Sequence, residues 1–419
     1  MQNICSIITM VNVMERLILY IDVNNAFLSW TATEKLNNGE ETDIRNIPAV
    51  IGGDEEKRSG IVLAKSQLAK EFGIKTGETL YSARKKCPGI KVYPSNFEIY
   101  RKYSDAMIEI LKRYTEKIER MSIDECAIDL TNFVQKDEKI EDVAKEISDT
   151  IKNELKFTVN IGISHNKMLA KMASDFEKPD KIHTLYENEI KEKMWKLPVS
   201  ELLMVGRKTT EKLNLIGIYK IGELASRNEK DIIRRFGKLG KTIWEYANGI
   251  DNSPVKPNDD IPKGIGNSVT LPHDEKNLDK LNEVLLALCE QVAYRLRKQK
   301  MKTKTVNVQI KNNEFQNFSH QRKMQEETDS TKIIFTEAKK LLYELYNSAS
   351  NKNVRLIGLR VDTSNGENEQ ITLFKETKEE NEKQNKVDKT IDYLKEKYGY
   401  DMVTRAGKMH IEKMIRLKE

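Results

Sequence analysis

The feature that most constrains this chain is a short apolar run that ends in a carboxylate. Residues 17–21 are almost wholly apolar, and Asp22 follows them. A run this short, without polar alternation, is typical of a strand buried on both faces. Strand-like and helix-like patterns then alternate to residue 174, which predicts an α/β or α+β domain. The expected strands are 47–51, 60–64, 121–130 (two strands around a turn) and 159–163, and the expected helices are 66–72, 97–118, 143–155 and 166–174.

The rest of the chain divides into two further regions. Residues 197–250 have a helical pattern, with glycine turns at Gly206 and Gly237. Residues 253–262 hold three of the nine prolines, which predicts an exposed, stiff linker at a domain boundary. Beyond the linker, a small, separate α+β domain is expected from helices at 281–296 and 333–346 and strands at 306–310 and 354–361. Residues 375–389 are almost entirely charged or polar, so we expect them to be disordered.

Composition limits the class of protein. The chain has 419 residues, a formal net charge of +6 and four cysteines without CxxC spacing. The length allows roughly two to four domains. The cysteine spacing disfavours a zinc site or a disulfide framework and fits a reducing, cytoplasmic location. No apolar run approaches the ~20 residues of a membrane helix. Residues 1–13 lack the features of a signal peptide, and Met14 is a second candidate start that would make them an extension.

Three carboxylates lie at predicted strand ends. Asp22 ends the most apolar strand, and Asp124 with Glu125 forms the tip of the turn within residues 121–130. Adjacent strand residues face opposite sides, so Asp124 and Glu125 can share one metal only if the turn bends the backbone between them. Carboxylates at the head of a rigid sheet can hold a pair of hard divalent cations whose other ligands are phosphates. Taken singly, each could instead be a solvated turn residue or a helix cap.

Around these carboxylates the sequence resembles a known family. Residues 20–27 (YIDVNNAF) and 122–129 (SIDECAID) resemble the two catalytic motifs of the Y-family (translesion) DNA polymerases. Residues 162–171 (GISHNKMLAK), followed by Lys178 and Pro179, resemble the third palm motif of that family. Further resemblances are those of residues 58–66 to the finger segment of the UmuC-like branch in gram-positive bacteria, 197–224 to the thumb and 354–359 to a little-finger strand. Nearly the whole chain therefore resembles a Y-family polymerase of the UmuC/DinB type.

The resemblance implies a multidomain α+β, right-hand polymerase with a palm, small fingers, a helical thumb with helix-hairpin-helix elements and an α+β little finger. It implies template-directed translesion synthesis of low fidelity, without proofreading, in which dNTPs are added to a primer 3′-hydroxyl. The implied boundaries are palm 1–25 and 96–175, fingers 26–95, thumb 176–252, linker 253–263, little finger 264–366 and a C-terminal tail 367–419 that carries a clamp-binding peptide.

Roles for individual residues follow from the matching positions. The expected catalytic residues are Asp22, Asp124 and Glu125, which with the Val23 carbonyl would hold two Mg²⁺ ions, or Mn²⁺ in their place. One ion would activate the 3′-hydroxyl and the other would neutralise the triphosphate. Asn24 replaces an aspartate that is often found there and is not a metal ligand in the family. Phe27 is the expected steric gate against ribonucleotides. The expected dNTP-binding residues are Asn24, Asn25, Ala26, Phe27, Ser66, Lys70 and Lys167.

The finger helix departs from the family pattern, because Gln67 and Lys70 stand where many members have a tyrosine and an arginine. A lysine supplies charge but not a bidentate fork. A solvated helix lysine therefore remains an alternative for Lys70.

Two basic regions are expected to contact DNA. At the glycine turns, amides at helix N-termini can bind phosphates without reading sequence. Residues 295–304 contain six basic and no acidic residues and lead into a strand with a polar face, an expected track along the phosphate backbone. The predicted DNA-binding residues are Gly206, Arg207, Lys208, Gly237, Lys238, Arg295, Arg297, Lys298, Lys300, Lys302 and Lys304.

A short apolar segment predicts a protein partner. Gln370, Leu373 and Phe374 in the segment QITLF resemble the peptide with which bacterial polymerases bind the β-subunit sliding clamp; a small strand of the little finger is the alternative. The expected partners are primer–template DNA, dNTPs and the clamp, with no membrane and a monomeric chain.

Two other functions remain open at this point. Residues 52–55 (GGDE) match the signature turn of diguanylate cyclases, but that turn ends in a phenylalanine and here Glu56 follows. A noncatalytic DNA-binding repair accessory would keep the thumb and little finger without an active site, and the intact Asp22, Asp124 and Glu125 argue against it.

Overall fold

A computed structural model describes residues 16–55, 58, 60–134, 139–257, 262–364 and 375–399. The chain divides into two compact units, one formed by residues 1–52 and 62–259 and the other by residues 53–61 and 260–419. Within the described ranges, no helix is both long enough and apolar enough to cross a membrane.

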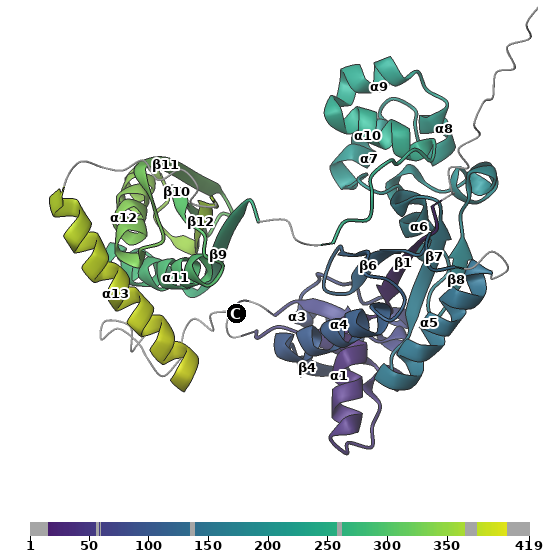
Figure 1. Ribbon diagram of the computed structural model, residues 1–419, viewed down its shortest axis with the longest axis horizontal. Helices are drawn as coiled ribbons and strands as arrows, with labels where there is room; N and C mark the ends of the chain where they lie inside the picture. Colours follow the sequence, from purple (N-terminus) through teal and green to yellow (C-terminus); the bar gives the residue numbers. More distant parts are fainter. Residues whose placement is uncertain are drawn as a thin grey trace, which may run out of the picture. The chain divides into compact units, whose positions relative to one another are not determined.

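The first unit is built on a five-stranded sheet in the order β5-β6-β1-β7-β8. Figure 1 shows β6, β1, β7 and β8 of this sheet. β1 pairs antiparallel with both β6 and β7, and β7 pairs parallel with β8. Every residue of β1 is buried, which confirms the strand expected from the apolar run. The strands are β1 (Ile18–Val23), β5 (Ile118–Arg120), β6 (Glu125–Asp129), β7 (Val159–Ser164) and β8 (Ile182–Thr184).

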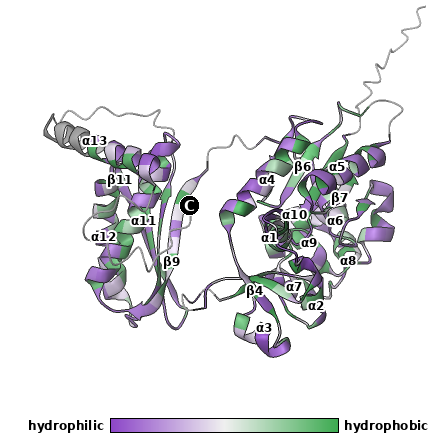
Figure 2. Cartoon of the chain, turned by 90° about the horizontal axis from the view of Figure 1, so that it is seen from below, coloured by the Kyte–Doolittle hydropathy of each residue, from purple (hydrophilic) through white to green (hydrophobic). Residues whose placement is uncertain are grey.

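Helices cover both faces of this sheet. α4 (Phe97–Leu111) and α5 (Ile140–Leu155) share a core with Leu19 and Ile21 of β1, on one face. These helices have hydrophobic and hydrophilic residues in alternation (Figure 2), as expected of helices with one buried side. α6 (Lys167–Ser174) packs on the opposite face, where Ala170 lies in a cluster with Tyr20.

A glycine allows α6 to lie close to the sheet. A Cβ atom on Gly162 of β7 would stand 1.9 Å from the carbonyl oxygen of Ala170, so only a glycine fits there. Side chains alternate along β1, so Asp22 faces the same side as Tyr20, toward α6.

The expected helix over 97–118 is shorter than its apolar spacing predicted. α4 ends at Leu111, and residues 118–120 form β5, whose backbone pairs with β6. The 3.6-residue spacing continued to Tyr114 because this residue packs against the same core as the helix, although it lies in the turn.

The remainder of the first unit contains a small sheet and a helical region. The small sheet has the order β3-β2-β4, with β2 antiparallel to β3 and parallel to β4. The helical region shares its core with α6 through Met168, Leu169 and Met172. The elements are α1 (Ala26–Asn37), β2 (Ala49–Gly52), β3 (Val62–Lys65), α2 (Gln67–Glu71), α3 (Leu80–Lys86), β4 (Lys91–Pro94), α7 (Arg207–Asn214), α8 (Ile221–Ala225), α9 (Glu229–Phe236) and α10 (Lys238–Ala247), with short 3-10 or π turns at Ile44–Asn46, Glu187–Glu189, Ile190–Met194 and Val199–Glu201.

One apolar residue of the predicted linker is buried, whereas the other described residues at 253–257 are exposed, as predicted. Val255 is buried in a cluster with Ile18 and Tyr20, and the backbone amide of Lys256 donates to Glu119 of β5. Proline content predicted the lack of regular structure, but not that an apolar side chain within it would pack on the sheet.

The second unit is an antiparallel sheet in the order β11-β10-β12-β9 that packs on two helices. Val306, Val308 and Ile310 face the helices, and the residues between them are more exposed, which confirms the predicted half-buried strand. The elements are β9 (Gly264–Glu275), α11 (Leu278–Lys298), β10 (Thr303–Asn312), β11 (Asn317–Thr328), α12 (Thr331–Ser348) and β12 (Val354–Asp362).

The expectation of disorder at 375–389 is wrong. This segment belongs to α13 (Lys375–Tyr398), which packs on the second unit through polar contacts. Asp392 forms a bidentate ion pair with Arg297 of α11. Asp388 accepts a hydrogen bond from the backbone amide of Thr331, the first residue of α12. Charged composition alone could not reveal this, because the carboxylates find their partners only on a folded surface.

Candidate active site

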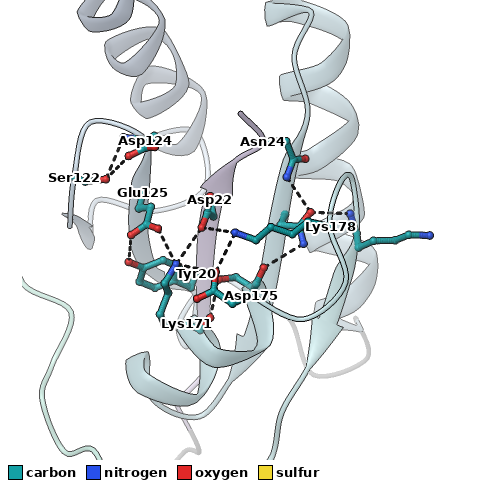
Figure 3. Close-up of polar contacts among 12 residues, drawn as sticks. Tyr20, Asp22, Asn24, Ser122, Asp124, Glu125, Lys171, Asp175 and Lys178 are labelled. Carbon is teal, nitrogen blue, oxygen red and sulfur yellow. Dashed lines mark hydrogen bonds and ion pairs between the residues drawn. The ribbon is translucent and has the colours of Figure 1, made fainter. Parts of the chain in front are cut away.

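Strand register brings two of the three predicted carboxylates together. Asp22 on β1 lies opposite Glu125 on β6. The ammonium group of Lys171, from α6, lies between them, 3.0 Å from Asp22 Oδ2 and 2.7 Å from Glu125 Oε1 (Figure 3). Lys178, in the loop after α6, reaches the same oxygen of Asp22 at 2.8 Å. Both lysines also contact Asp175, at 3.1 and 3.0 Å.

Burial and the neighbouring lysines shift the pKa values of these carboxylates in opposite directions. Burial alone would raise the pKa of Asp22, but Lys171 and Lys178 outweigh burial and hold this pKa below its usual value. The pKa of Glu125 is raised, because burial and the charge of Asp22 outweigh the contact with Lys171. Burial opposes the charge of each lysine, yet the carboxylates raise the pKa of both. The site therefore consists of carboxylates balanced by bound ammonium groups.

The third carboxylate, Asp124, lies in the turn just before β6. Its backbone carbonyl accepts a hydrogen bond from the amide of Val23, which ties the turn to the end of β1. Its side chain accepts a hydrogen bond from the Ser122 hydroxyl at 2.5 Å and does not join Asp22 and Glu125 (Figure 3). In this structure the Asp124 carboxylate therefore points away from the other two carboxylates, and its role as a shared metal ligand stays a prediction.

The donor set is suitable for a divalent cation. Its carboxylate oxygens are hard ligands, and an ammonium group now supplies the positive charge that a metal ion would bring. Among the described residues, no group of three His, Cys, Asp or Glu side chains has a metal-binding arrangement. The residues fit a metal if Asp124 adopts a different rotamer and Lys171 withdraws from the carboxylates.

Phe27 packs against three other aromatic side chains. It is half-buried in the first turn of α1 and stacks on Tyr100 with ring centroids 4.5 Å apart. Trp30 makes a tilted contact at 6.2 Å and Phe97 an edge-to-face contact at 6.0 Å. α1 begins after Asn25, whose φ of 48° is left-handed, a conformation that asparagine tolerates better than most residues.

Three of the predicted dNTP-binding residues have partners within the protein in this structure. The Ser66 hydroxyl is buried and accepts from the amides of Ala49 and Ala69, so it holds backbone and not substrate. Lys167 pairs with Glu119 at 2.7 Å, because α6 turns it toward β5. The Asn24 side chain is buried and bonded to Asn160 and Thr158.

The backbone amide of Asn24 is also engaged, because it donates to the Thr158 carbonyl. It therefore cannot belong to the anion-binding nest that the sequence predicted. Lys70 is exposed on α2, and Asn25 is exposed before α1; their predicted roles stay predictions.

The predicted DNA-binding residues separate into exposed and engaged groups. Arg297 was predicted to contact DNA, but its side chain is only 10% exposed and its guanidinium group pairs with Asp392. Gly206 is the residue before α7, and Gly237, with φ 62°, joins α9 to α10. The exposed members are Gly206, Arg207, Lys208, Gly237, Lys238, Arg295, Lys298 and Lys300; Lys302 and Lys304 are partly exposed. Gln370, Leu373 and Phe374 lie outside the described residues.

Sequence reasoning missed three site residues. Lys171 lies four residues after Lys167, so helical spacing put both on neighbouring positions, but only Lys171 reaches the carboxylates. Lys178 belongs to the Lys-Pro pair that follows the third motif, and the motif alone assigned no partner to its ammonium group. Tyr20, whose hydroxyl donates to Glu125 Oε2 at 2.8 Å, could have been found from its position two residues before Asp22, on the same strand face.

Comparison with known proteins agrees with this architecture. The profile of the impB/mucB/samB family matches residues 21–175, that of its C-terminal domain matches residues 262–373, and that of the IMS family HHH motif matches residues 187–218. The chain is 47% identical to DNA polymerase IV of Clostridium acetobutylicum, with 94% of this chain and 98% of that protein covered. This chain is a Y-family DNA polymerase.

Other relatives and solved structures agree with the family assignment. The polymerase is 39% identical to DNA polymerase IV of Acetivibrio thermocellus, over 94% of this chain and 97% of that protein. It is 33% identical to DNA polymerase IV 1 of Bacillus subtilis, over 95% and 94%. A chimeric Y-family DNA polymerase of Dbh and Dpo4 has the same fold, with a TM-score of 0.72 at 23% identity, over 83% of this chain and 98% of that one.

The polymerase therefore has the predicted right-hand α+β fold and carries out DNA-directed translesion synthesis that depends on divalent metal. Neither alternative function is favoured. The family match includes the segment with Asp22, Asp124 and Glu125, which a noncatalytic accessory would not need. The same family match spans the GGDE segment at residues 52–55, so the polymerase family accounts for the segment that suggested a cyclase. The first glycine of this segment, Gly52, is the last residue of β2.

Proposed function

We propose that Asp22, Asp124 and Glu125, with the Val23 carbonyl, hold two Mg²⁺ ions during DNA synthesis, and that Mn²⁺ can replace them. The observation that carries the proposal is the register of Asp22 against Glu125, with an ammonium group bound between their oxygens. When bound, such ions activate the primer 3′-hydroxyl and neutralise the triphosphate and the leaving pyrophosphate.

Lys171 and Lys178 take part by exchanging partners. Both balance Asp22 in the structure, and Asp175 is a second carboxylate within reach of each. With a divalent cation balancing Asp22, both ammonium groups would be available to the triphosphate at this edge of the sheet. This assigns to Lys171 and Lys178 the phosphate contacts that the sequence assigned to Lys167 and Ser66.

Phe27 is the proposed steric gate. A steric gate excludes the 2′-hydroxyl of a ribonucleotide only if its side chain keeps its position. Stacking on Tyr100 holds the Phe27 ring in place. Asn25, Ala26 and Phe27 lie at the N-terminus of α1, where amides without intrahelical partners favour a phosphate.

Two surfaces are proposed to bind the phosphate backbone of primer–template DNA. In the helical region, the helix starts after Gly206 and Gly237 expose amides beside Arg207, Lys208 and Lys238. In the second unit, the sheet face opposite α11 and α12 presents the polar residues of β10, next to the basic residues at 295–304 apart from Arg297. Contacts of this kind are sequence-independent and weaken steeply with salt.

Two proposals concern partners and rest on sequence alone. The segment containing Gln370, Leu373 and Phe374 is proposed to bind the sliding clamp, and the chain is proposed to act as a monomer. Replacement of Leu373 and Phe374 by alanine is expected to abolish clamp-stimulated synthesis and to leave distributive synthesis intact.

The metal assignment is tested with Asp22→Asn and Glu125→Gln. Loss of one ligand is expected to lower primer extension by about 10³-fold, because a metal supplies several kcal/mol of transition-state stabilisation. Binding of primer–template is expected to persist. Glu34→Gln is the matched control, because Glu34 likewise accepts from a lysine and a tyrosine, Lys102 and Tyr103. Full primer extension by Glu125→Gln would refute the assignment.

A further inference from the structure

Tyr20 contacts Glu125 but has no part in the chemistry proposed above. It lies opposite Ala127 in the β1–β6 ladder, while Asp22 lies opposite Glu125. The small side chain of Ala127 leaves room for the phenol ring to extend along the sheet to its diagonal neighbour. There its hydroxyl donates to Glu125 Oε2 at 2.8 Å (Figure 3).

The two oxygens of Glu125 therefore have different donors: Lys171 binds Oε1 and Tyr20 binds Oε2. These two donors differ in how easily their side chains can move away from Glu125. Lys171 has a long side chain that also contacts Asp175, so it can leave Glu125 without losing every partner. Tyr20 is only 4% exposed and packs with Ala127 and Ala170, so its hydroxyl stays in place.

We propose that Tyr20 is a positioning residue that holds Oε2 of Glu125, so that the carboxylate presents Oε1 alone, in a fixed direction, to the catalytic metal. The proposal rests on the assignment of Glu125 as a metal ligand. Lys171 is the exchangeable donor, whose withdrawal would leave Oε1 free to bind a divalent cation, and Tyr20 is the permanent donor. Groups that orient a metal ligand in this way typically change metal affinity by about 10–100-fold.

The test is a Mg²⁺ titration of Tyr20→Phe in a complex that cannot react. The complex contains the protein, a primer ending in a dideoxynucleotide, its template and the correct dNTP. The Mg²⁺ concentration at which half of the complex has bound Mg²⁺ is measured. Tyr20→Phe keeps the ring and its packing, and it is expected to raise this concentration by about 10-fold. Its affinity for primer–template without Mg²⁺ is expected to match that of the unmodified protein, and its thermal unfolding is expected to match that of Tyr103→Phe, which loses a similar hydrogen bond.

Tyr103→Phe is the matched control. Tyr103 is also 4% exposed, and its hydroxyl donates to a glutamate, Glu34, at 2.9 Å, away from the site. Its Mg²⁺ titration is expected to be unchanged. Equal titrations of Tyr20→Phe and Tyr103→Phe would overturn the proposal.

Glu125→Gln separates this proposal from the one on which it rests. If Glu125→Gln shifts the titration and Tyr20→Phe does not, Glu125 is a ligand but Tyr20 does not position it. If Glu125→Gln also leaves the titration unchanged, the ligand assignment fails, and the role of Tyr20 fails with it.

Discussion

The close packing of α6 on β7 makes Gly162→Ala the most informative single substitution. The new Cβ atom would lie 1.9 Å from the Ala170 carbonyl oxygen and 2.5 Å from the Ser174 amide nitrogen. Both are backbone atoms, so no side chain can move aside. To reach even 3.0 Å from the oxygen, α6 must move by about 1.1 Å, the difference between 3.0 and 1.9 Å. Overpacking of this kind costs about 1–3 kcal/mol and sometimes more, and we expect about 3 kcal/mol here.

The same movement would disturb the active site. Lys171 is on α6, so a displacement of about 1.1 Å would shift the backbone that carries the ammonium group proposed to contact the triphosphate. A misplacement of about 1 Å can cost about 10²-fold in rate, so kcat/KM for primer extension is expected to fall by that order.

Denaturant unfolding of the full chain and single-nucleotide primer extension measure the two effects. Gly89→Ala is the control, because a Cβ atom there meets nothing within 4 Å and φ is not left-handed. It is expected to change stability by less than about 0.5 kcal/mol. If Gly162→Ala unfolds and extends primers like Gly89→Ala, α6 does not pack on β7 as closely as the structure shows, and the placement of Lys171 loses its basis.

Three further predictions concern other parts of the chain. Phe27→Ala is expected to raise ribonucleotide incorporation by at least 10-fold relative to deoxynucleotide incorporation, and an unchanged ratio would remove Phe27 as the gate. Asp388→Ala is expected to destabilise the start of α12 by about 1–2 kcal/mol, because Asp388 accepts from the Thr331 amide; faster hydrogen exchange in the first turn of α12 would show this, and unchanged exchange would contradict it. Burial raises the pKa of Asp362, but hydrogen bonds from Thr305, Thr303 and nearby amides outweigh burial and lower it below the unfolded-state value. Asp362 therefore stabilises the fold above its unfolded-state pKa of about 3.9, and this contribution is lost as pH falls through the lower folded-state value. Asp362→Asn removes the carboxylate that accepts these hydrogen bonds and should reduce the difference in unfolding temperature between pH 7 and pH 3. An unchanged difference would refute this role of Asp362.

Much of the fold and part of the site could be predicted from local sequence patterns. An apolar run of strand length must be buried on both faces, so it identified β1, and alternation identified β10. Asp22 and Glu125 were found because strand ends carry ligands at the edge of a sheet, and the register of β1 against β6 brings them together. The strands and their acidic ends depend on neighbours within a few residues, which a sequence displays directly, whereas the pairing of β1 with β6 joins segments distant in sequence.

Tertiary structure alone decided which polar groups meet. Lys167 and Lys171 lie one helical turn apart in the same motif, yet one pairs with Glu119 and the other with Asp22 and Glu125, because α6 presents them to different strands. Arg297 belongs to a basic run, but carboxylates almost a hundred residues later engage it. A long charged side chain reaches several possible partners at similar cost, so its contact follows from the packing of elements distant in sequence. Periodicity describes one element at a time and carries no information about that packing.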